Sequence, residues 1–387
     1  MSPEPIPEPS PESGPDSPGT FDPARFARRA GDWLREAGPE SDVVFSCRVR
    51  LARNLARTPF VVRLNTPDAE KVCGILREAL TGVRIDGETH FLPMRGTSQI
   101  LRLVLRERHL ISRDLAPVEE NAKVPRGRAV AFGDSETVSA MVNEEDHLRL
   151  QAMAPGFDLD LAWQRVSDLD RALEERLDFA ATEKLGYLTG CPTNVGTGMR
   201  ASVMMHLPAL SMVRSELEKV FTAAQRTGMA VRGLHGEGSR AAGDFYQVSN
   251  QITLGRSEDQ LLDDLRALVP SILEFERRMR EALLEDRRAA LTDRVCASLA
   301  TLRTATSMPT DEALGHLSNL RLGHHLGLVH DVNPTLLGLM LVRIQRGHLQ
   351  ALERPDDARD PAGHLLEASE RARLRPAYLR RELAIRN

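Results

Sequence analysis

The sequence predicts an α+β fold that is followed by an α-helical region. Apolar and polar residues alternate in several stretches between about residues 40 and 255, as they do in half-buried strands, and helical stretches lie between them. From residue 257 onward most of the pattern is helical. Hydrophobic residues make up 41% of the 387 residues, which is enough for a sizeable core and excludes a wholly disordered or fibrous protein.

The first 23 residues have little that a fold could bury. They contain eight prolines, five acidic residues and no basic residue, so we expect a disordered tail over 1–23. Without this tail the formal net charge rises from −4 to +1. A near-neutral fold lacks the basic stripe that is typical of nucleic-acid-binding proteins, so we expect no direct nucleic-acid partner.

The first part of the fold is predicted to contain a short helix and two strands. Residues 24–37 have apolar side chains at helical spacing and predict an amphipathic helix. Residues 41–55 alternate and predict a strand that carries Arg48 and Arg50 on one face. Residues 137–150 predict a second strand, which leads into a turn.

Helices, strands and loops follow one another from residue 159 to residue 254. In chain order we expect a helix over 159–177, a loop over 186–198, a strand over 200–207, a helix over 215–228, a strand over 229–234, a Gly-rich loop over 233–243 and a strand over 247–254. A helix over 257–287 and further helices then complete the chain, with breaks at Pro309, Pro334 and Pro355.

The four cysteines are widely spaced and form no CxxC pair, which indicates neither a disulfide framework nor a zinc site. No apolar run approaches the roughly 18 residues that a membrane span needs. The N-terminus also lacks the basic and apolar segments of a secretion signal. We therefore expect a reduced, cytoplasmic protein without a membrane partner.

A run of charged residues follows the apolar alternation at 138–142. Residues 143–149 contain three carboxylates, a histidine and Arg149. Adjacent carboxylates such as Glu144 and Glu145 repel each other, which can raise the pKa of one so that it accepts a proton near neutral pH. The alternative is a solvated turn, which is the usual place for such a run.

Arg48 and Arg50 would present two guanidinium groups side by side, close in sequence to Arg53. Like charges in contact are costly unless an anion lies between them, and guanidinium binds phosphate in a bidentate manner. The alternative is a pair of surface arginines. Together with nearby carboxylates, the arginines near strand ends suit phosphoryl transfer to a cationic acceptor. These arginines are Arg48, Arg50, Arg149, Arg200 and Arg232.

Two Gly-rich loops accompany these charges. The loop at 191–200 is not a Walker A motif, because no Gly-Lys-Ser/Thr follows, but its backbone N–H groups could hold an anion. Its single cysteine, Cys191, more often signals a small buried side chain than a nucleophile. The loop at 232–239 is either a surface hairpin or a lid that excludes water from a substrate.

These motifs resemble the signatures of the guanidino (phosphagen) kinases, and longer runs resemble the bacterial protein-arginine kinases of that family. The motifs lie at 46–50, 143–147, 191–194, 200–203 and 232–237, and the longer runs at 40–55, 186–210 and 236–255. The resemblance implies an antiparallel β-sheet flanked by helices, a glutamine-synthetase-like fold, in a catalytic domain over 24–280. It also implies an α-helical domain over 281–387 for dimerisation and regulation.

The resemblance also implies the roles of individual residues. The phosphates of ATP would be held by Arg48, Arg50, Arg149, Arg200 and Arg232. Further nucleotide contacts would be Ser46, His109, Ala201, Ser202, Val203, Met204, Gly233, Leu234, His235 and Gly236. Glu144 and Glu145 would engage the target guanidinium, one of them as the base. Glu237 would clamp the guanidinium and Cys191 would orient it, while Mg²⁺ would be held through the nucleotide phosphates and not by a protein ligand.

The activity implied by the resemblance is ATP-dependent phosphorylation of arginine side chains in proteins, which marks them for Clp proteolysis or regulates a stress repressor. The implied partners are protein substrates with exposed arginine, a McsA-like zinc-finger activator, a Clp ATPase and a second copy in a homodimer. Two alternatives stay open. One is a small-guanidine phosphagen kinase that acts on free arginine, and the other is a catalytically silent adaptor.

One C-terminal motif departs from the family. The phosphoarginine sensor of the protein-arginine kinases reads Arg-Asp-x-x-Arg-Ala, whereas residues 371–376 lack the aspartate and the final alanine. Arg371 and Arg375 could still bind a phosphate group in a regulatory site. The alternative is that they belong to a solvated basic helix.

Overall fold

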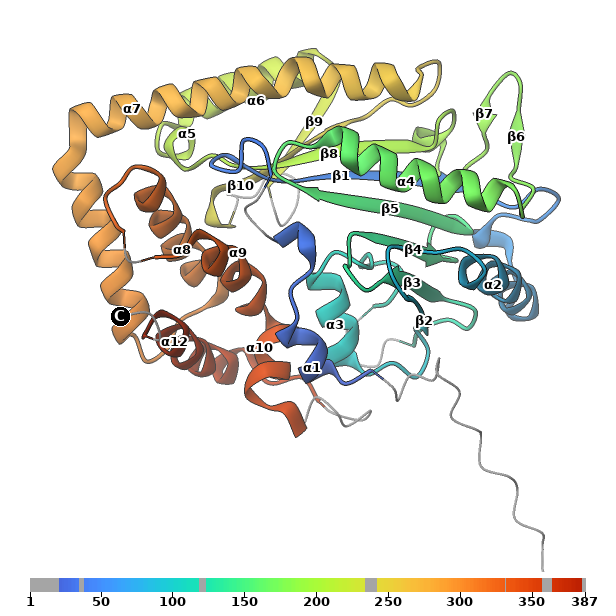
Figure 1. The fold of residues 1–387 in the computed structure, drawn as a ribbon, viewed down its shortest axis with the longest axis horizontal. Helices are drawn as coiled ribbons and strands as arrows, with labels where there is room; N and C mark the ends of the chain where they lie inside the picture. The colour runs from blue at the N-terminus through green and yellow to red at the C-terminus, as the bar shows by residue number, and fades with distance from the viewer. Residues whose placement is uncertain are drawn as a thin grey trace, which may run out of the picture.

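One antiparallel β-sheet of eight strands forms the centre of the structure (Figure 1). The computed structural model describes residues 21–34, 38–117, 123–233, 242–330, 332–356 and 364–384. The strand order is β2-β3-β4-β5-β1-β8-β10-β9, and neighbouring strands run antiparallel. These strands are β1 (Val44–Arg53), β2 (Thr89–Pro93), β3 (Ala129–Gly133), β4 (Val138–Val142), β5 (Leu148–Pro155), β8 (Met199–His206), β9 (Met229–Gly233) and β10 (Phe245–Asn250). A separate small hairpin consists of β6 (Ala181–Thr182) and β7 (Gly186–Tyr187).

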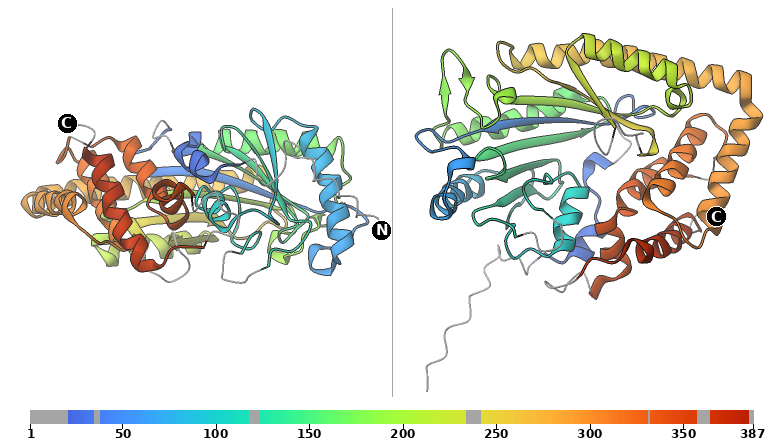
Figure 2. Two further views of the ribbon diagram at one scale, coloured as in Figure 1. Left: turned by 90° about the horizontal axis from the view of Figure 1, so that it is seen from below. Right: turned by 180° about the vertical axis from the view of Figure 1, so that it is seen from behind.

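Helices pack on the sheet and continue into a C-terminal bundle beside one end of it (Figures 1 and 2). The α-helices are α1 (Pro23–Arg28), α2 (Thr66–Thr81), α3 (Gln99–Glu107), α4 (Leu159–Glu174), α5 (Pro208–Met212), α6 (Arg214–Arg226), α7 (Glu258–Thr304), α8 (Thr310–His325), α9 (Pro334–Arg343), α10 (Arg346–Glu353) and α12 (Ala368–Ala384). Short 3₁₀ turns are η2 (Asp32–Leu34), η3 (Val61–Arg63), η4 (Pro192–Asn194) and η5 (Ala242–Asp244). No helix within the described ranges is long and apolar enough to cross a membrane. The architecture confirms the predicted α+β fold with a helical C-terminal region.

Side chains alternate between the two faces of the sheet, as in any extended strand. On β1, Cys47, Val49 and Leu51 are fully buried in the main core, which α4 and the first half of α7 cover. The intervening Arg48 and Arg50 therefore face the other side. The neighbouring strands β5, β8 and β10 alternate in the same way, so polar side chains of four adjacent strands share one surface.

The 47-residue helix α7 joins the sheet to the C-terminal bundle. Leu262 and Val269 of its first half lie in the core of the sheet, and Val295 lies in a second core with α8, α9 and α12. Its helical geometry is interrupted at Arg287, where φ is −139°. The domain boundary predicted between residues 280 and 281 falls inside this helix and stays a prediction.

The helix predicted over 24–37 is too long. α1 ends at Arg28, and only the short turn η2 follows it. The reason is a tertiary contact, because the N–H of Asp32 donates to the carbonyl of Ser135 in the turn between β3 and β4. This contact pulls the chain out of the helix, an outcome that apolar spacing alone does not predict.

The strand predicted over 247–254 begins and ends earlier, as β10. Its end is explained by the side chain of Asn250, which replaces a backbone partner in the ladder with β8. The Oδ1 atom of Asn250 accepts from the N–H of Ala201 at 2.8 Å, and its Nδ2 donates to the carbonyl of Met199 at 3.0 Å. The residues beyond Asn250 are thereby released to contact a neighbouring loop.

Arg53 does not belong with Arg48 and Arg50, although the three are close in sequence. Side chains alternate along β1, so Arg53 shares a face with Cys47 and Leu51 and not with Arg50. It therefore points to the α4 side, where it is 2% exposed. Its Nε and Nη2 donate to both carboxylate oxygens of Asp170 at 3.1 and 2.6 Å. Its guanidinium also lies 3.5 Å from the ring centroid of Tyr187. Arg53 is thus a structural residue.

We predict that Asp170→Ala lowers the free energy of unfolding by about 3–5 kcal/mol, because it leaves the Arg53 guanidinium buried without its counter-ion. The matched control is Asp168→Ala on the same helix. That change removes the pair with Arg171, whose two side chains are 57% and 71% exposed, and should cost about 0.5 kcal/mol or less. Urea denaturation measures both, and equal effects would contradict the structural role of Arg53.

Candidate active site

Four arginines gather on the polar surface of the sheet. Arg48 and Arg50 project from β1, Arg149 from β5 and Arg200 from β8, and Arg50 lies opposite Arg200 in the strand register. Within the described residues, Arg48 and Arg50 form no ion pair with a carboxylate, and the buried Nε of Arg50 has no hydrogen-bond partner. Such unbalanced positive charge suits an anion with several negative charges, such as a polyphosphate.

The electrostatics of the cluster support this interpretation. Burial lowers the pKa of Arg48 to about 10, and repulsion from Arg200 and Arg149 acts in the same direction. The pKa of Arg50 is also lowered, first by burial and then by repulsion from Arg48. A bound anion would offset the repulsion and favour the charged guanidinium groups, so the cluster suits an anionic ligand.

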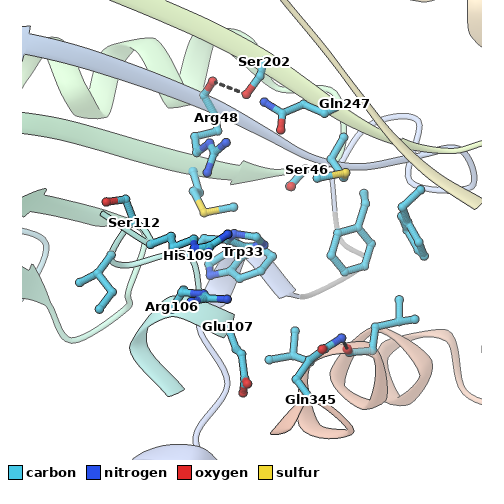
Figure 3. Close-up of a pocket in the computed structure, with 18 of the residues that line it drawn as sticks. Trp33, Ser46, Arg48, Arg106, Glu107, His109, Ser112, Ser202, Gln247 and Gln345 are labelled. Atoms are coloured by element: carbon cyan, nitrogen blue, oxygen red, sulfur yellow. Dashed lines mark hydrogen bonds between the residues drawn. The ribbon is translucent and has the colours of Figure 1, made fainter. Parts of the chain in front are cut away.

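A cavity of about 650 Å³ opens beside the arginine cluster (Figure 3). This volume is in the usual range for sites that bind small molecules. Its walls come from β1, β8 and β10, from α3 and the loop after it, from η2, and from the corner between α9 and α10. The lining residues that Figure 3 labels are Trp33, Ser46, Arg48, Arg106, Glu107, His109, Ser112, Ser202, Gln247 and Gln345.

His109 lies in this cavity as an uncharged ring. Burial lowers its pKa to about 3, and the nearby Arg48 and Arg50 contribute to the shift. Its backbone is in the left-handed region, with φ at 59°, and its carbonyl accepts a hydrogen bond from the side chain of Gln151. The ring lies 5.5 Å, centroid to centroid, from that of Trp33. A neutral aromatic pair next to buried cations suits the base and phosphates of a nucleotide.

A second, smaller cavity of about 190 Å³ is lined by Glu145 and by Arg50, Arg149 and Arg200 of the cluster. Arg149 contacts two carboxylates, Glu144 through Nη1 at 2.7 Å and Glu145 through Nη2 at 3.0 Å. Glu144 is buried, whereas the Glu145 side chain is 43% exposed and lines the cavity with Cys191. Burial raises the pKa of Glu145, opposed by Arg149, and the adjacent Asp146 and Glu144 raise it further.

The other members of the charged run are structural. His147 accepts from the N–H of Leu55 through Nδ1 at 3.0 Å, and its Nε2 lies 2.9 Å from the carbonyl of Pro59, to which it donates as a neutral ring. The Oδ1 atom of Asp146 accepts from the side chain of Asn54 at 2.6 Å and from the N–H of Gly190 at 2.5 Å. The run predicted as one cluster therefore divides into two carboxylates at the site and two buried residues that hold the turn.

The loop before β8 supplies the far wall of the small cavity. Thr253 fixes it from the segment after β10, because its hydroxyl donates to the carbonyls of Thr193 and Val195 at 2.9 and 2.7 Å. The Cys191 sulfur lies 3.0 Å from the hydroxyl of Thr193. The loop ends at Gly198, which has a φ of 64° and would place a Cβ 2.6 Å from the carbonyl of Ala52. Only glycine fits there.

Only some of the side chains predicted to contact the nucleotide line the large cavity. Ser46, Ser202 and Met204 line the large cavity. The side chains of Ala201 and Val203 instead lie fully buried in the core on the opposite face of β8. The alternation of β8 is the reason, because every second residue faces away from the cavity. Only their backbone could reach a nucleotide, and their contact stays a prediction.

Arg232 stands somewhat apart from the four arginines. It projects from the edge strand β9, is exposed, and lines a third cavity of about 420 Å³ with Arg200 and Thr193. Gly233 is the last residue of that strand. The remaining predicted contacts of the Gly-rich loop lie outside the described residues; they are Leu234, His235, Gly236 and Glu237.

Several residues that line the large cavity were not predicted. The alternation of β10 could have suggested Gln247, which shares a face with the neighbouring Ser202 and Met204 of β8. Trp33 and Gln345 gave no such signal, because they reach the cavity only through tertiary packing from the two ends of the chain.

Arg375 is not part of a solvated basic helix. It is 1% exposed on α12, and its guanidinium donates to the carbonyls of Ile344 and Met308 at 3.0 and 2.6 Å. Arg371, one turn earlier, donates to the carbonyl of Leu366. Both arginines therefore hold the backbone of the C-terminal bundle, and the prediction of a solvated helix was wrong for Arg375.

Comparisons with known proteins agree with this geometry. Residues 71–279 match the family described as ATP:guanido phosphotransferase, C-terminal catalytic domain, and residues 288–387 match the family described as protein-arginine kinase McsB C-terminal domain. Among solved structures, the duplicated taurocyamine kinase from Schistosoma mansoni is similar, with a TM-score of 0.56 and 28% identity. The match covers 64% of this chain and 35% of that one. The chain therefore belongs to the ATP:guanido phosphotransferase family.

Its relatives narrow this class. The protein-arginine kinase of Halothermothrix orenii is 43% identical over 83% of this chain and 90% of its own length. The protein-arginine kinase of Symbiobacterium thermophilum is 40% identical over 92% and 98%. Within the family, the chain belongs to the protein-arginine kinases.

We predict that Asp146→Ala loosens the wall of the small cavity, because it leaves the buried donors of Asn54 and Gly190 without an acceptor. The expected loss in the free energy of unfolding is about 1–3 kcal/mol. In parallel, iodoacetamide should modify Cys191 faster, as measured by mass spectrometry, while the exposed Cys296 serves as an unchanged internal reference. Asp146→Asn keeps the accepting oxygen and should behave nearly as the wild type. A Cys191 rate that Asp146→Ala leaves unaltered would refute this role.

Proposed function

We propose that this chain is an ATP-dependent protein-arginine kinase, which transfers the γ-phosphoryl group of ATP to the guanidinium groups of arginines in proteins. The observation that carries the proposal is the meeting of two charge patterns at one place. Arg48 lines the large cavity and Arg50 and Arg200 line the small one beside it. Glu145 also lines the small cavity, and Arg149 pairs with both Glu144 and Glu145. One pattern fits a polyphosphate, and the other fits a cationic acceptor.

The large cavity and the arginines next to it fit a nucleotide. Arg48 in the large cavity and Arg50 and Arg200 in the adjoining small one would hold its phosphates, consistent with the unpartnered Nε of Arg50. Arg149 and Arg232 would complete the set. His109 and Trp33 would contact the base or the ribose. No cluster of three or more His, Cys, Asp or Glu in the described ranges suits a metal ion. Mg²⁺ would thus be held through the nucleotide phosphates, where it neutralises their charge.

The small cavity would receive the target side chain. A guanidinium has a pKa above 12 and is a poor nucleophile until a base removes a proton from its nitrogen. Glu145 would accept this proton while the nitrogen forms a bond to the γ-phosphorus and the bond from phosphorus to the ADP oxygen breaks. Glu144 would hold the cation, Cys191 would orient it, and Glu237 of the Gly-rich loop would clamp it.

Two alternatives differ in their acceptor or their chemistry. A phosphagen kinase would phosphorylate free arginine, but the similarity of this chain to protein-arginine kinases favours arginine in polypeptides. A silent adaptor would have no use for Arg48 and Arg50, which have no carboxylate partner in the described part of the chain, because burial of unpaired charge is costly. We further propose a cytoplasmic homodimer that works with a McsA-like zinc-finger activator and a Clp ATPase on stress-related substrates.

We expect the purified protein to phosphorylate arginines of an unfolded protein such as casein when Mg-ATP is present. Glu145→Gln or Arg48→Ala should each lower the rate about 10²-fold or more, because each removes a group that acts on the transition state. Mass spectrometry of the acid-labile product measures the phosphate on arginine. Label on free L-arginine alone would identify the phosphagen kinase alternative. No label on either acceptor, with a candidate activator added, would favour the adaptor.

The pH dependence of kcat/KM should reveal Glu145. As the proposed base it must be ionised, so activity should fall as the pH drops through its raised pKa, and the acid limb should lie above that of an ordinary glutamate. A hydrogen bond from Cys191 lowers this pKa, so Cys191→Ala should move the acid limb to higher pH. Cys191→Ser keeps a donor and should move it less. An acid limb that stays in place in Cys191→Ala would count against Glu145 as the base.

A further inference from the structure

The C-terminal bundle contributes a wall to the cavity assigned to the nucleotide. Gln345 and Arg346, at the corner between α9 and α10, line this cavity together with Arg48 and His109. Figure 3 shows Gln345 on the helical wall, with Ser46 on the strand across from it. The cavity is therefore built by two regions that lie far apart in the sequence.

A carboxylate holds this corner against the sheet domain. Glu107, the last residue of α3, accepts hydrogen bonds from the backbone N–H groups of Gly347 and His348 at 2.8 and 2.9 Å. It also accepts from Nδ1 of His348 at 2.7 Å. The first N–H groups of a helix have no partner within it, so Glu107 caps α10 from another element. Its side chain is 10% exposed, so solvent weakens these bonds little.

His348 also connects α10 to the segment that contains His109. The Nε2 atom of His348 accepts from Nε of Arg108 at 2.9 Å, and Nη1 of Arg108 donates to Glu136 at 2.6 Å. Both Arg108 and His348 are fully buried. Glu107, Arg108 and His109 are consecutive, so the residues that fix the α10 corner adjoin the proposed nucleotide contact.

The approach of α10 to α3 is close at one position. A Cβ on Gly347 would lie 2.5 Å from the Cβ of Leu103 and 3.0 Å from the backbone nitrogen of Val104. Only glycine allows this contact. The hydrogen bonds from Gly347 and His348 to Glu107, which we call the Glu107 clamp, therefore hold the two helices at a fixed separation. Gln345 lies two residues before Gly347, and its Nε2 donates to the carbonyl of Leu341 at 3.1 Å. This bond orients the amide and leaves Oε1 as an acceptor.

We infer that Gln345 binds the nucleotide and that the Glu107 clamp positions it, so that the C-terminal bundle forms part of the ATP site. This inference rests on the proposed function, which assigns ATP to the large cavity. The amide of Gln345 is uncharged and matches the hydroxyl and amino groups of ribose and adenine, whereas Arg48 on the strand side of the cavity matches the phosphates. Glu107 acts through Gln345 as a positioning residue.

The test is titration of the full-length protein with Mg-ADP, followed by the fluorescence of Trp33. This residue lines the cavity, and a Trp163→Phe background removes the other tryptophan, which lies on α4. Gln345→Ala should raise the Kd about 3- to 10-fold, as expected for the loss of one hydrogen bond. Gln164→Ala, an exposed change of the same kind on α4, should leave the Kd as it was.

A double-mutant cycle separates positioning from stability. Glu107→Gln cannot accept all three hydrogen bonds and should also raise the Kd for Mg-ADP. If Glu107 acts through Gln345, the double variant should bind more tightly than the product of the two single effects predicts. Effects that multiply would overturn the positioning role. Should Glu107→Gln fail to fold, Gln345→Ala alone still decides whether the bundle contacts the nucleotide.

The outcomes distinguish the inference from the function on which it rests. Binding of Mg-ADP by the wild type with an unchanged Kd in Gln345→Ala would overturn the inference and leave the proposed kinase intact. Absence of Mg-ADP binding in the wild type would overturn both. A raised Kd in Gln345→Ala, with normal binding in Gln164→Ala, would support the contribution of the bundle.

Discussion

Residues of an extended strand point alternately to two faces, and β1 uses both for different purposes. Its odd-numbered residues from Cys47 to Leu51 build the main core, while the even-numbered Arg48 and Arg50 face the cleft. A shift of one residue in pairing would bury the arginines in the core and expose the core to water. The apolar face therefore fixes the positions of the charges, and the site depends on the packing behind it.

This arrangement explains how positive charges can stay close together. Burial and repulsion from neighbouring arginines lower the pKa of both Arg48 and Arg50, yet their backbone is held between β5 and β8 on either side. The sheet thus sustains an unfavourable charge distribution that flexible loops would relax. Arg149 differs, because it already contacts Glu144 and Glu145 and so links the arginine cluster to the carboxylates.

Local patterns predicted the parts of the site that depend on neighbours in sequence. The alternation around Arg48 and the adjacency of Glu144 and Glu145 were sufficient to place them. Distant partners were not predictable in this way. Arg53 pairs with Asp170, and Glu107 holds His348, across long separations for which the sequence offers no spacing rule. Arg375 resembled a surface residue, because its partners are the backbone carbonyls of Ile344 and Met308. The composition of a basic helix does not indicate such partners.

The helix α7 has a consequence for how such a protein can change over evolution. Its contour of about 70 Å crosses from one hydrophobic core to the other, so each core contributes to the stability of the same helix. Separating the sheet from the bundle would expose one apolar half of α7 to water. The unit that can be exchanged between proteins therefore includes this helix, and new C-terminal regions have to be joined to it and not merely appended after the sheet.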